Sequence, residues 1–98
     1  MKYINLVYED DILDVDILSV PNEVADNIES IVKEFEAWCG IPENARRFMI
    51  YNDQGAYMSV DTEEFLWWLN EVKLQGREKA VIVKQHTTIC YDYPCAEF

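Results

Sequence analysis

The sequence predicts one compact acidic domain over residues 1–98, of the α+β class. We expect an antiparallel or mixed sheet of about five strands with two helices on one face, in the order β-β-α-β-β-α-β. Half of the residues are hydrophobic and 13% are aromatic, which supplies apolar surface for a single core in a chain of this length. Short runs with a period of two alternate with two longer runs of helical period. No linker, low-complexity stretch or clear repeat divides the chain.

The first two strands are expected over residues 2–8 and 12–20, and the polar turn between them is Glu9-Asp10-Asp11. The second run alternates apolar and acidic side chains, which predicts one face against the core and one face in water. Its apolar positions are Leu13, Val15 and Ile17. Its acidic positions are Asp14 and Asp16. These two runs therefore predict an N-terminal hairpin with an acidic outer face.

The first helix is expected over residues 23–39, with Asn22 available as its N-cap. Apolar residues recur there every three or four positions and charged residues fall on the opposite face, which is typical of a helix that packs on a sheet. Gly40 and Pro42 end the helix. The apolar positions are Val24, Ile28, Ile31, Val32, Phe35 and Trp38.

A second hairpin is expected from residues 46–51 and 56–60, which flank the turn sequence Asn-Asp-Gln-Gly at 52–55. Glycine at the end of that turn suits a positive φ. The two strands should therefore pair directly.

The second helix is expected over residues 61–74, because the acidic run at 61–64 suits the positive end of a helix dipole. Gly76 marks its end. Residues 79–85 are rich in β-branched side chains and predict a central strand. The residues from His86 onward are polar and aromatic, and they either extend this strand or pack as a coil.

The charge of the chain restricts its partners. Nineteen acidic residues stand against eight lysines and arginines, for a net charge of −11. Residues 1–40 contribute −8 of this charge and residues 41–98 contribute −3. A negative surface repels nucleic acid and attracts basic proteins. We therefore expect a basic, nucleic-acid-binding protein as partner and no direct contact with nucleic acid.

The candidate partner-binding residues are mostly acidic. Five carboxylates lie within eight residues of the N-terminal hairpin, and carboxylates at alternate strand positions are about 7 Å apart, similar in spacing to phosphates. The apolar residues between them and the missing glycine do not fit a calcium loop. Trp67 is expected on the outer face of the second helix as an aromatic anchor, unless it packs on a segment of its own chain. The candidates are Glu9, Asp10, Asp11, Asp14, Asp16, Asp26, Glu29, Glu36 and Trp67.

The cysteines and the single histidine offer little chemistry. His86, Cys90 and Cys95 have the spacing H-x₃-C-x₄-C, and Cys39 could add a fourth ligand, but no C-x₂-C knuckle typical of zinc sites is present. A reactive thiolate needs a positive environment, which this chain does not provide. We therefore predict no enzymatic activity, no metal and no cofactor. Three cysteines, no signal-peptide pattern and no long apolar segment lead us to expect a cytoplasmic protein without membrane contact.

These features predict a small acidic inhibitor that occupies the basic nucleic-acid groove of a nuclease or defence protein. Phage anti-restriction and anti-CRISPR proteins, and immunity proteins for nuclease toxins, are of this physical type. The alternative is a structural or adaptor domain, or a homodimer, whose acidity serves only solubility. A small enzyme or metal protein built on His86, Cys90 and Cys95 is a third possibility.

Overall fold

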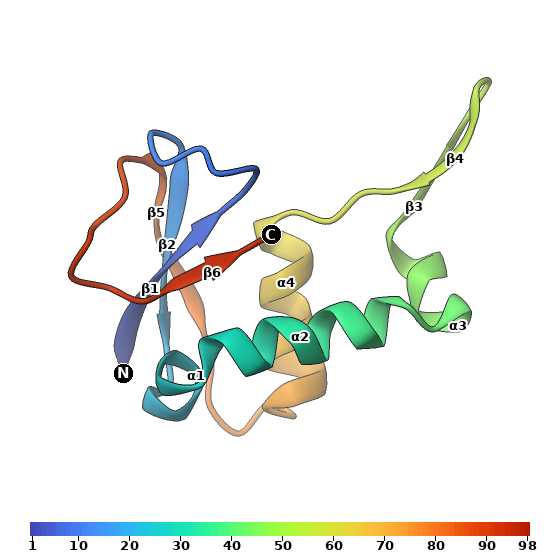
Figure 1. Ribbon diagram of the computed structural model, residues 1–98. Coiled ribbons are helices and arrows are strands. Elements are labelled where there is room, and N and C mark those ends of the chain that lie inside the picture. The colour runs from blue at the N-terminus through green and yellow to red at the C-terminus, as the bar shows by residue number, and fades with distance from the viewer.

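The computed structural model describes all of residues 1–98 and has an α+β architecture (Figure 1). The strands form a four-stranded mixed sheet and a separate two-stranded ribbon, in place of the single five-stranded sheet that we expected. The strands are β1 (Lys2–Val7), β2 (Val15–Val20), β3 (Met49–Asn52), β4 (Gly55–Met58), β5 (Val81–Thr87) and β6 (Cys95–Glu97). The α-helices are α1 (Asn22–Asp26), α2 (Ile28–Cys39), α3 (Pro42–Ala45) and α4 (Thr62–Trp68). Two short helical turns are η1 (Arg46–Phe48) and η2 (Leu69–Lys73).

The four-stranded sheet has the order β5-β2-β1-β6. Strands β1 and β2 form the predicted antiparallel hairpin, with Lys2 opposite Val20 and Leu6 opposite Asp16. β2 begins at Val15 and not at residue 12, so Leu13 lies exposed in the turn, and its predicted place on the core face was wrong. β5 is antiparallel to β2, and β6 is parallel to β1. The prediction of a central strand at residues 79–85 was wrong, because β5 pairs only with β2 and lies at the edge. β-branched residues favour a strand without fixing its place in the sheet.

The core lies between one face of this sheet and the helices α2 and α4. Ile4 and Leu18 come from the sheet, and the predicted apolar positions of α2 are buried except for the half-buried Trp38. Phe35 is central, since its ring centroid lies 5.2 Å from those of Phe65 and Trp68. The predicted helix over residues 23–39 is interrupted at Asn27, whose backbone is not helical.

The second predicted helix continues from α4 into the π-helical turn η2. The N–H of Leu74 donates to the carbonyl of Leu69 at 2.8 Å, and this wider turn is accompanied by a bridge to the start of β5. The buried Asn70 side chain donates to the Ala80 carbonyl at 3.0 Å and accepts from the Ala80 N–H at 2.8 Å. These two hydrogen bonds fix where β5 begins.

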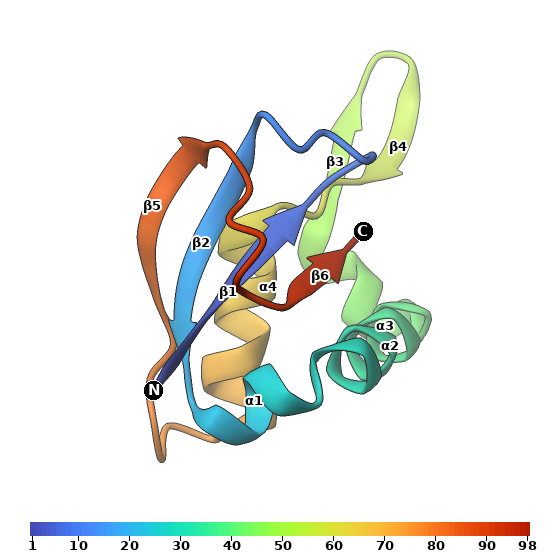
Figure 2. The same ribbon diagram turned by 60° about the vertical axis from the view of Figure 1, so that its left-hand side comes forward.

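The second face of the sheet is covered by residues 88–94, named here the crossing segment. It runs from the end of β5 at one edge to β6 at the other edge (Figures 1 and 2). The fully buried Asn5 holds it, because its Nδ2 donates to the carbonyls of Cys90 and Tyr93 at 2.9 and 3.2 Å. Its Oδ1 accepts from the Cys90 N–H at 3.0 Å. Both faces of β1 and β2 are therefore covered.

β6 carries Phe98 into the helix side of the core. The Phe98 ring lies 5.3 Å from that of Tyr8, 5.2 Å from that of Phe65 and 6.2 Å from that of Phe35. Its N–H donates to the Val7 carbonyl at 2.9 Å. His86 and Thr87 thus extend the strand and residues 88–94 pack without regular structure, as expected, whereas the strand β6 was not predicted.

The ribbon β3–β4 confirms the predicted second hairpin. Asn52 lies opposite Gly55, and Gly55 has φ +125°, a conformation in which a side chain would be strained. Arg46–Phe48 form the turn η1 instead of the first part of the strand. The ribbon projects away from the rest of the molecule (Figure 1).

Candidate functional site

The turn between β1 and β2 presents three exposed carboxylates at one end of the sheet: Glu9, Asp10 and Asp11. The Asp11 carboxylate accepts a hydrogen bond from the Leu13 N–H at 3.1 Å, and the Glu9 N–H donates to the Phe98 carbonyl at 3.3 Å. Glu9 and Asp10 have φ of 53° and 60°, the left-handed region in which glycine costs least. The turn is therefore held in a defined conformation, and acidic side chains occupy positions that favour glycine.

The N-terminus of α4 brings more carboxylates to the same end. Asp61 and Glu63 border one hollow of about 240 Å³ together with Asp14 and Asp16. We name Glu9, Asp10, Asp11, Asp14, Asp61 and Glu63 the acidic end. From the sequence, Asp61 and Glu63 are expected only to begin a helix. Nothing in the sequence places the start of α4 beside the first hairpin, so this part of the site was missed.

A capping box fixes the first turn of α4. The Asp61 carboxylate accepts from the Glu63 N–H at 3.0 Å, and the Glu64 carboxylate accepts from the Asp61 N–H at 3.2 Å. Interaction with the Glu64 side chain lowers the pKa of Asp61 below its ordinary value. Partial burial raises the pKa of Glu64. Asp61 is therefore the more acidic member of this pair.

Asp16 is buried, so its predicted place on a solvated strand face was wrong. It is 9% exposed, and its carboxylate accepts hydrogen bonds from the Thr62 hydroxyl and, at 3.1 Å, from the His86 N–H. The Tyr8 hydroxyl lies 2.9 Å from the Thr62 hydroxyl, and burial raises the pKa of Tyr8 to about 12. Asp16 thus links β2 to α4 and β5 inside the fold. Alternation of apolar and acidic residues predicted the wrong inner face for β2. The face that carries Ile17 packs under the crossing segment, and the face that carries Asp16 packs toward the helices.

Asp14 is exposed, as predicted, and it pairs with the only histidine. The His86 Nδ1 lies 2.8 Å from the Asp14 Oδ1. This hydrogen bond and the charge of Asp14 raise the pKa of His86 above 6.5, and Asp16 adds to the effect. The remaining residues of the acidic end have no lysine, arginine or histidine within 4 Å.

The Asp14→Asn variant is expected to lower the pKa of His86 toward 6.5. Because the folded-state pKa is raised, the pair stabilises the protein fully below pH 6.5, and this contribution is lost as the pH rises through the raised pKa. An NMR titration of the imidazole in both proteins measures the change. Asp53→Asn, at the exposed ribbon tip, should leave the pKa unchanged. Equal values in the Asp14→Asn variant and the parent would show that the pair does not form in solution.

The other predicted acidic residues lie on a different surface. Asp26 forms an ion pair with Lys2 at 2.6 Å, at the start of β1 and thus at the opposite end of the sheet from Glu9. Glu29 and Glu36 are exposed on α2, where they border a second hollow beside β6. The structure therefore divides the expected acidic stripe into two separate patches. The role of each patch in binding a partner stays a prediction.

Trp67 is half-buried against its own chain and does not project as an exposed anchor. Its ring lies 6.0 Å from that of Trp38 and 6.4 Å from that of Phe48. The Arg47 guanidinium carbon lies 3.7 Å above the Trp67 ring centroid. The alternative that we had kept open for Trp67 is therefore the one that the structure confirms. A helical wheel places Trp67 opposite the apolar face of the helix, but it does not reveal that η1 packs there.

Ion pairing leaves most of the negative charge uncompensated. The structure contains three ion pairs, Lys2–Asp26, Lys73–Glu34 and His86–Asp14. Six of the eight lysines and arginines have no carboxylate within 4 Å. No lysine or arginine therefore neutralises the acidic end.

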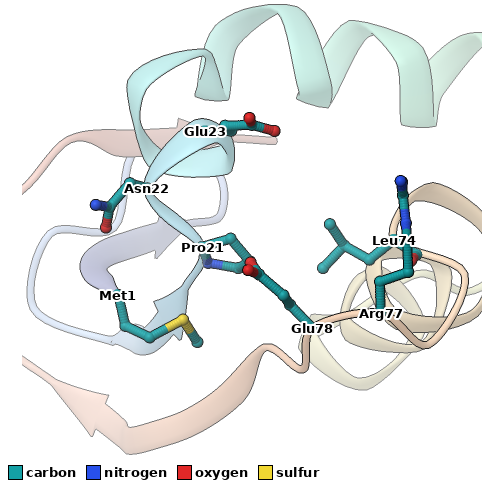
Figure 3. Close-up of a pocket in the computed structure, with 7 residues that line it drawn as sticks. All are labelled: Met1, Pro21, Asn22, Glu23, Leu74, Arg77 and Glu78. Carbon is teal, nitrogen blue, oxygen red and sulfur yellow. The ribbon is translucent and has the colours of Figure 1, made fainter.

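A further hollow, of about 500 Å³, lies at the other end of the sheet and is lined mostly by polar residues (Figure 3). Leu74 points into it, and the Glu78 carboxylate lies beside Pro21. Arg77 lines it too, and its Nε donates to the Leu74 carbonyl at 3.1 Å. None of the predicted candidate residues borders this hollow.

The cysteines and the histidine are not assembled into one site. No group of three or more histidine, cysteine, aspartate or glutamate side chains is close enough to hold a metal ion. Burial raises the pKa of the Cys39 thiol, which disfavours a reactive thiolate. Cys90 and Cys95 are free thiols, and the Asn5 side chain donates to the Cys90 carbonyl and to the Cys95 sulfur.

Comparisons with protein-family models, with curated proteins and with solved structures found no match to this chain. None of its helices combines the length and the apolar character that a membrane span requires.

Proposed function

We propose that this protein is a small acidic binding protein that occupies the basic nucleic-acid groove of a nuclease or defence protein and catalyses no reaction. The observation that carries the proposal is the acidic end, where carboxylates from two distant parts of the chain face solvent without a lysine or arginine partner. A basic groove that normally binds phosphates offers the complementary charge.

Two features of the turn support this proposal. Its backbone is tied to the fold through Glu9 and Asp11, so the carboxylates need little further ordering on binding. Glu9 and Asp10 also keep acidic side chains at left-handed positions, and unusual backbone conformations are common at functional sites. Binding through such charges should be fast and should weaken as the salt concentration rises.

The test compares two triple variants with the same change in net charge. In the first, Glu9, Asp10 and Asp11 are all changed to Lys. In the second, Asp26, Glu29 and Glu36 are all changed to Lys. We expect the parent protein and the second variant to retain one dominant basic protein from a lysate of the native host, with release by salt, and the first variant to lose it. The parent should then displace nucleic acid from that purified partner.

The outcome separates the proposal from its alternatives. If both variants retain the partner equally, or if bound nucleic acid is not displaced, the acidic end is not the binding surface. A structural or adaptor role, with acidity that serves only solubility, would then account better for the charge. Loss of binding in the second variant alone would move the site to α2.

A further inference from the structure

A groove runs between helix α2 and strand β6, which lie side by side in both views (Figures 1 and 2). Its first part is a hollow of about 460 Å³ between the N-terminal half of α2 and the start of β6. Its second part is a hollow of about 330 Å³ between the C-terminal end of α2, Phe98 and the base of the ribbon. Glu36 lines both hollows, so they lie end to end along α2. We name them together the α2–β6 groove.

The backbone along one wall of this groove is free to pair with another strand. β6 is an edge strand whose only neighbour is β1. The Asn5 N–H donates to the Pro94 carbonyl at 2.9 Å, and the Phe98 N–H also donates to β1. Since backbone groups alternate in direction along a strand, the N–H and C=O groups of Cys95 and Glu97 point to the outer edge. No strand of this chain pairs with them there.

The far end of the groove is apolar. Apolar side chains line the hollow beside Phe98, among them Phe35 and Val60, and Glu36 is its only charged residue. A volume of about 330 Å³ is near the lower limit of ligand pockets, so one large apolar side chain fits it better than a cofactor-sized molecule does.

The charges around the groove favour a basic occupant. Three exposed glutamates border it, and none of them has a lysine, arginine or histidine within 4 Å: Glu29, Glu36 and Glu97. Lys33 is the only basic residue that lines it, so the border is net negative. Such a border attracts lysine and arginine side chains and repels nucleic acid.

We propose that the α2–β6 groove binds a basic peptide segment of a partner protein in an extended conformation. The segment adds a strand to the free edge of β6 and places lysine or arginine beside the glutamates. It also inserts one large apolar side chain into the hollow beside Phe98, which fixes its register. This site goes beyond the proposed function and does not depend on it, because it uses none of the residues of the acidic end.

The probe is a displayed library of random peptides of about twelve residues, longer than an average strand. With the parent protein as bait, we expect enriched sequences that combine several lysines or arginines with one large apolar residue. Fluorescence anisotropy then gives the Kd of the most enriched peptide. Replacing its large apolar residue with alanine should raise the Kd at least about tenfold. Methylation of its backbone amides should weaken binding only at alternate positions, because only those amides face β6.

Two protein variants each replace three carboxylates with neutral amides. The groove variant is Glu29→Gln, Glu36→Gln and Glu97→Gln. The matched control, in the acidic end, is Glu9→Gln, Asp10→Asn and Asp11→Asn. General attraction of a basic peptide to a protein of net charge −11 weakens equally in both. The groove variant should raise the peptide Kd at least about tenfold and the control less than about twofold. Circular dichroism verifies that both are folded.

The thiols give a second measurement on the unmodified protein. Cys95 lines the groove and Cys90 does not, although both are half-buried. Saturating peptide should slow the alkylation of Cys95 by iodoacetamide and leave that of Cys90 unchanged.

Several outcomes would overturn the proposal. The library could enrich no basic sequence, the groove variant could bind the peptide as tightly as the parent, or the peptide could protect both cysteines equally. Loss of binding in the control alone would place the peptide on the acidic end. Self-association of the parent that the groove variant abolishes would assign the groove to a second copy.

Discussion

The Phe98→Ala variant is expected to lower the free energy of unfolding by about 2–3 kcal/mol, somewhat less than a fully buried phenylalanine would. The Phe98 ring closes one side of the aromatic core, against Tyr8, Phe35 and Phe65. Its loss leaves a cavity beside these three rings. For a domain of this size the melting temperature should fall by at least about 8 °C. Urea unfolding measured by tryptophan fluorescence gives the free energy.

Tyr91→Ala is the matched control, because Tyr91 is an aromatic residue of the crossing segment that is 78% exposed. It should change the free energy of unfolding by less than about 0.5 kcal/mol. Phe98→Leu should lie between the two alanine variants, since it keeps part of the apolar volume. Equal stability of Phe98→Ala and Tyr91→Ala would contradict the position of β6 and Phe98 in the core.

Local patterns predicted those elements whose stability depends on neighbouring residues in the chain. The amphipathic spacing of α2, the turn at Asn52–Gly55 and the β1–β2 hairpin were all correctly predicted. Each depends on periodicity or turn chemistry within about 20 residues. The break at Asn27 and the π-helical turn η2 depend on packing and on the Asn70–Ala80 bridge, so periodicity did not reveal them.

The position of each strand in the sheet could not be predicted, because it depends on contacts between distant residues. β6 lies beside β1 through a parallel pairing of residues about 90 positions apart. The crossing segment covers the face of β2 that carries Ile17, and α4 lies on the face that carries Asp16. Ile17 and Asp16 are therefore both buried although they are adjacent in β2 and point to opposite faces. Alternation identifies a strand, but it cannot identify how many faces are covered.

Only part of the candidate site could be predicted, because the rest depends on contacts between distant residues. The exposed carboxylates of the first turn follow from their polar, turn-forming sequence, and Glu9, Asp10 and Asp11 lie where we expected them. Asp61 and Glu63 join them only because α4 begins at the same end of the sheet. Composition gave the net charge correctly and gave no information on which carboxylates lie side by side.

The Asn5→Ala variant is expected to lower the free energy of unfolding by about 3 kcal/mol, through the loss of a buried hydrogen-bonded group. The Asn5 amide makes three hydrogen bonds to the backbone of Cys90 and Tyr93. Without it, the crossing segment has no polar attachment at the centre of the sheet, and the Cys90 N–H loses its partner. Urea unfolding should show this loss, and hydrogen exchange should show faster exchange over residues 88–94. Asn22→Ala, at an exposed asparagine, should change neither.

The Asn5→Asp variant distinguishes lost hydrogen bonds from lost volume. Asparagine and aspartate have nearly the same size, but a carboxylate cannot donate to the carbonyls of Cys90 and Tyr93 and would face them with its negative charge. Its folded-state pKa should therefore be raised, so the variant is least stable at neutral pH. Its deficit relative to the parent should narrow as the pH falls toward the ordinary aspartate pKa of about 3.9, where a protonated oxygen can donate. A deficit that does not depend on pH would show that Asn5 does not donate to the crossing segment.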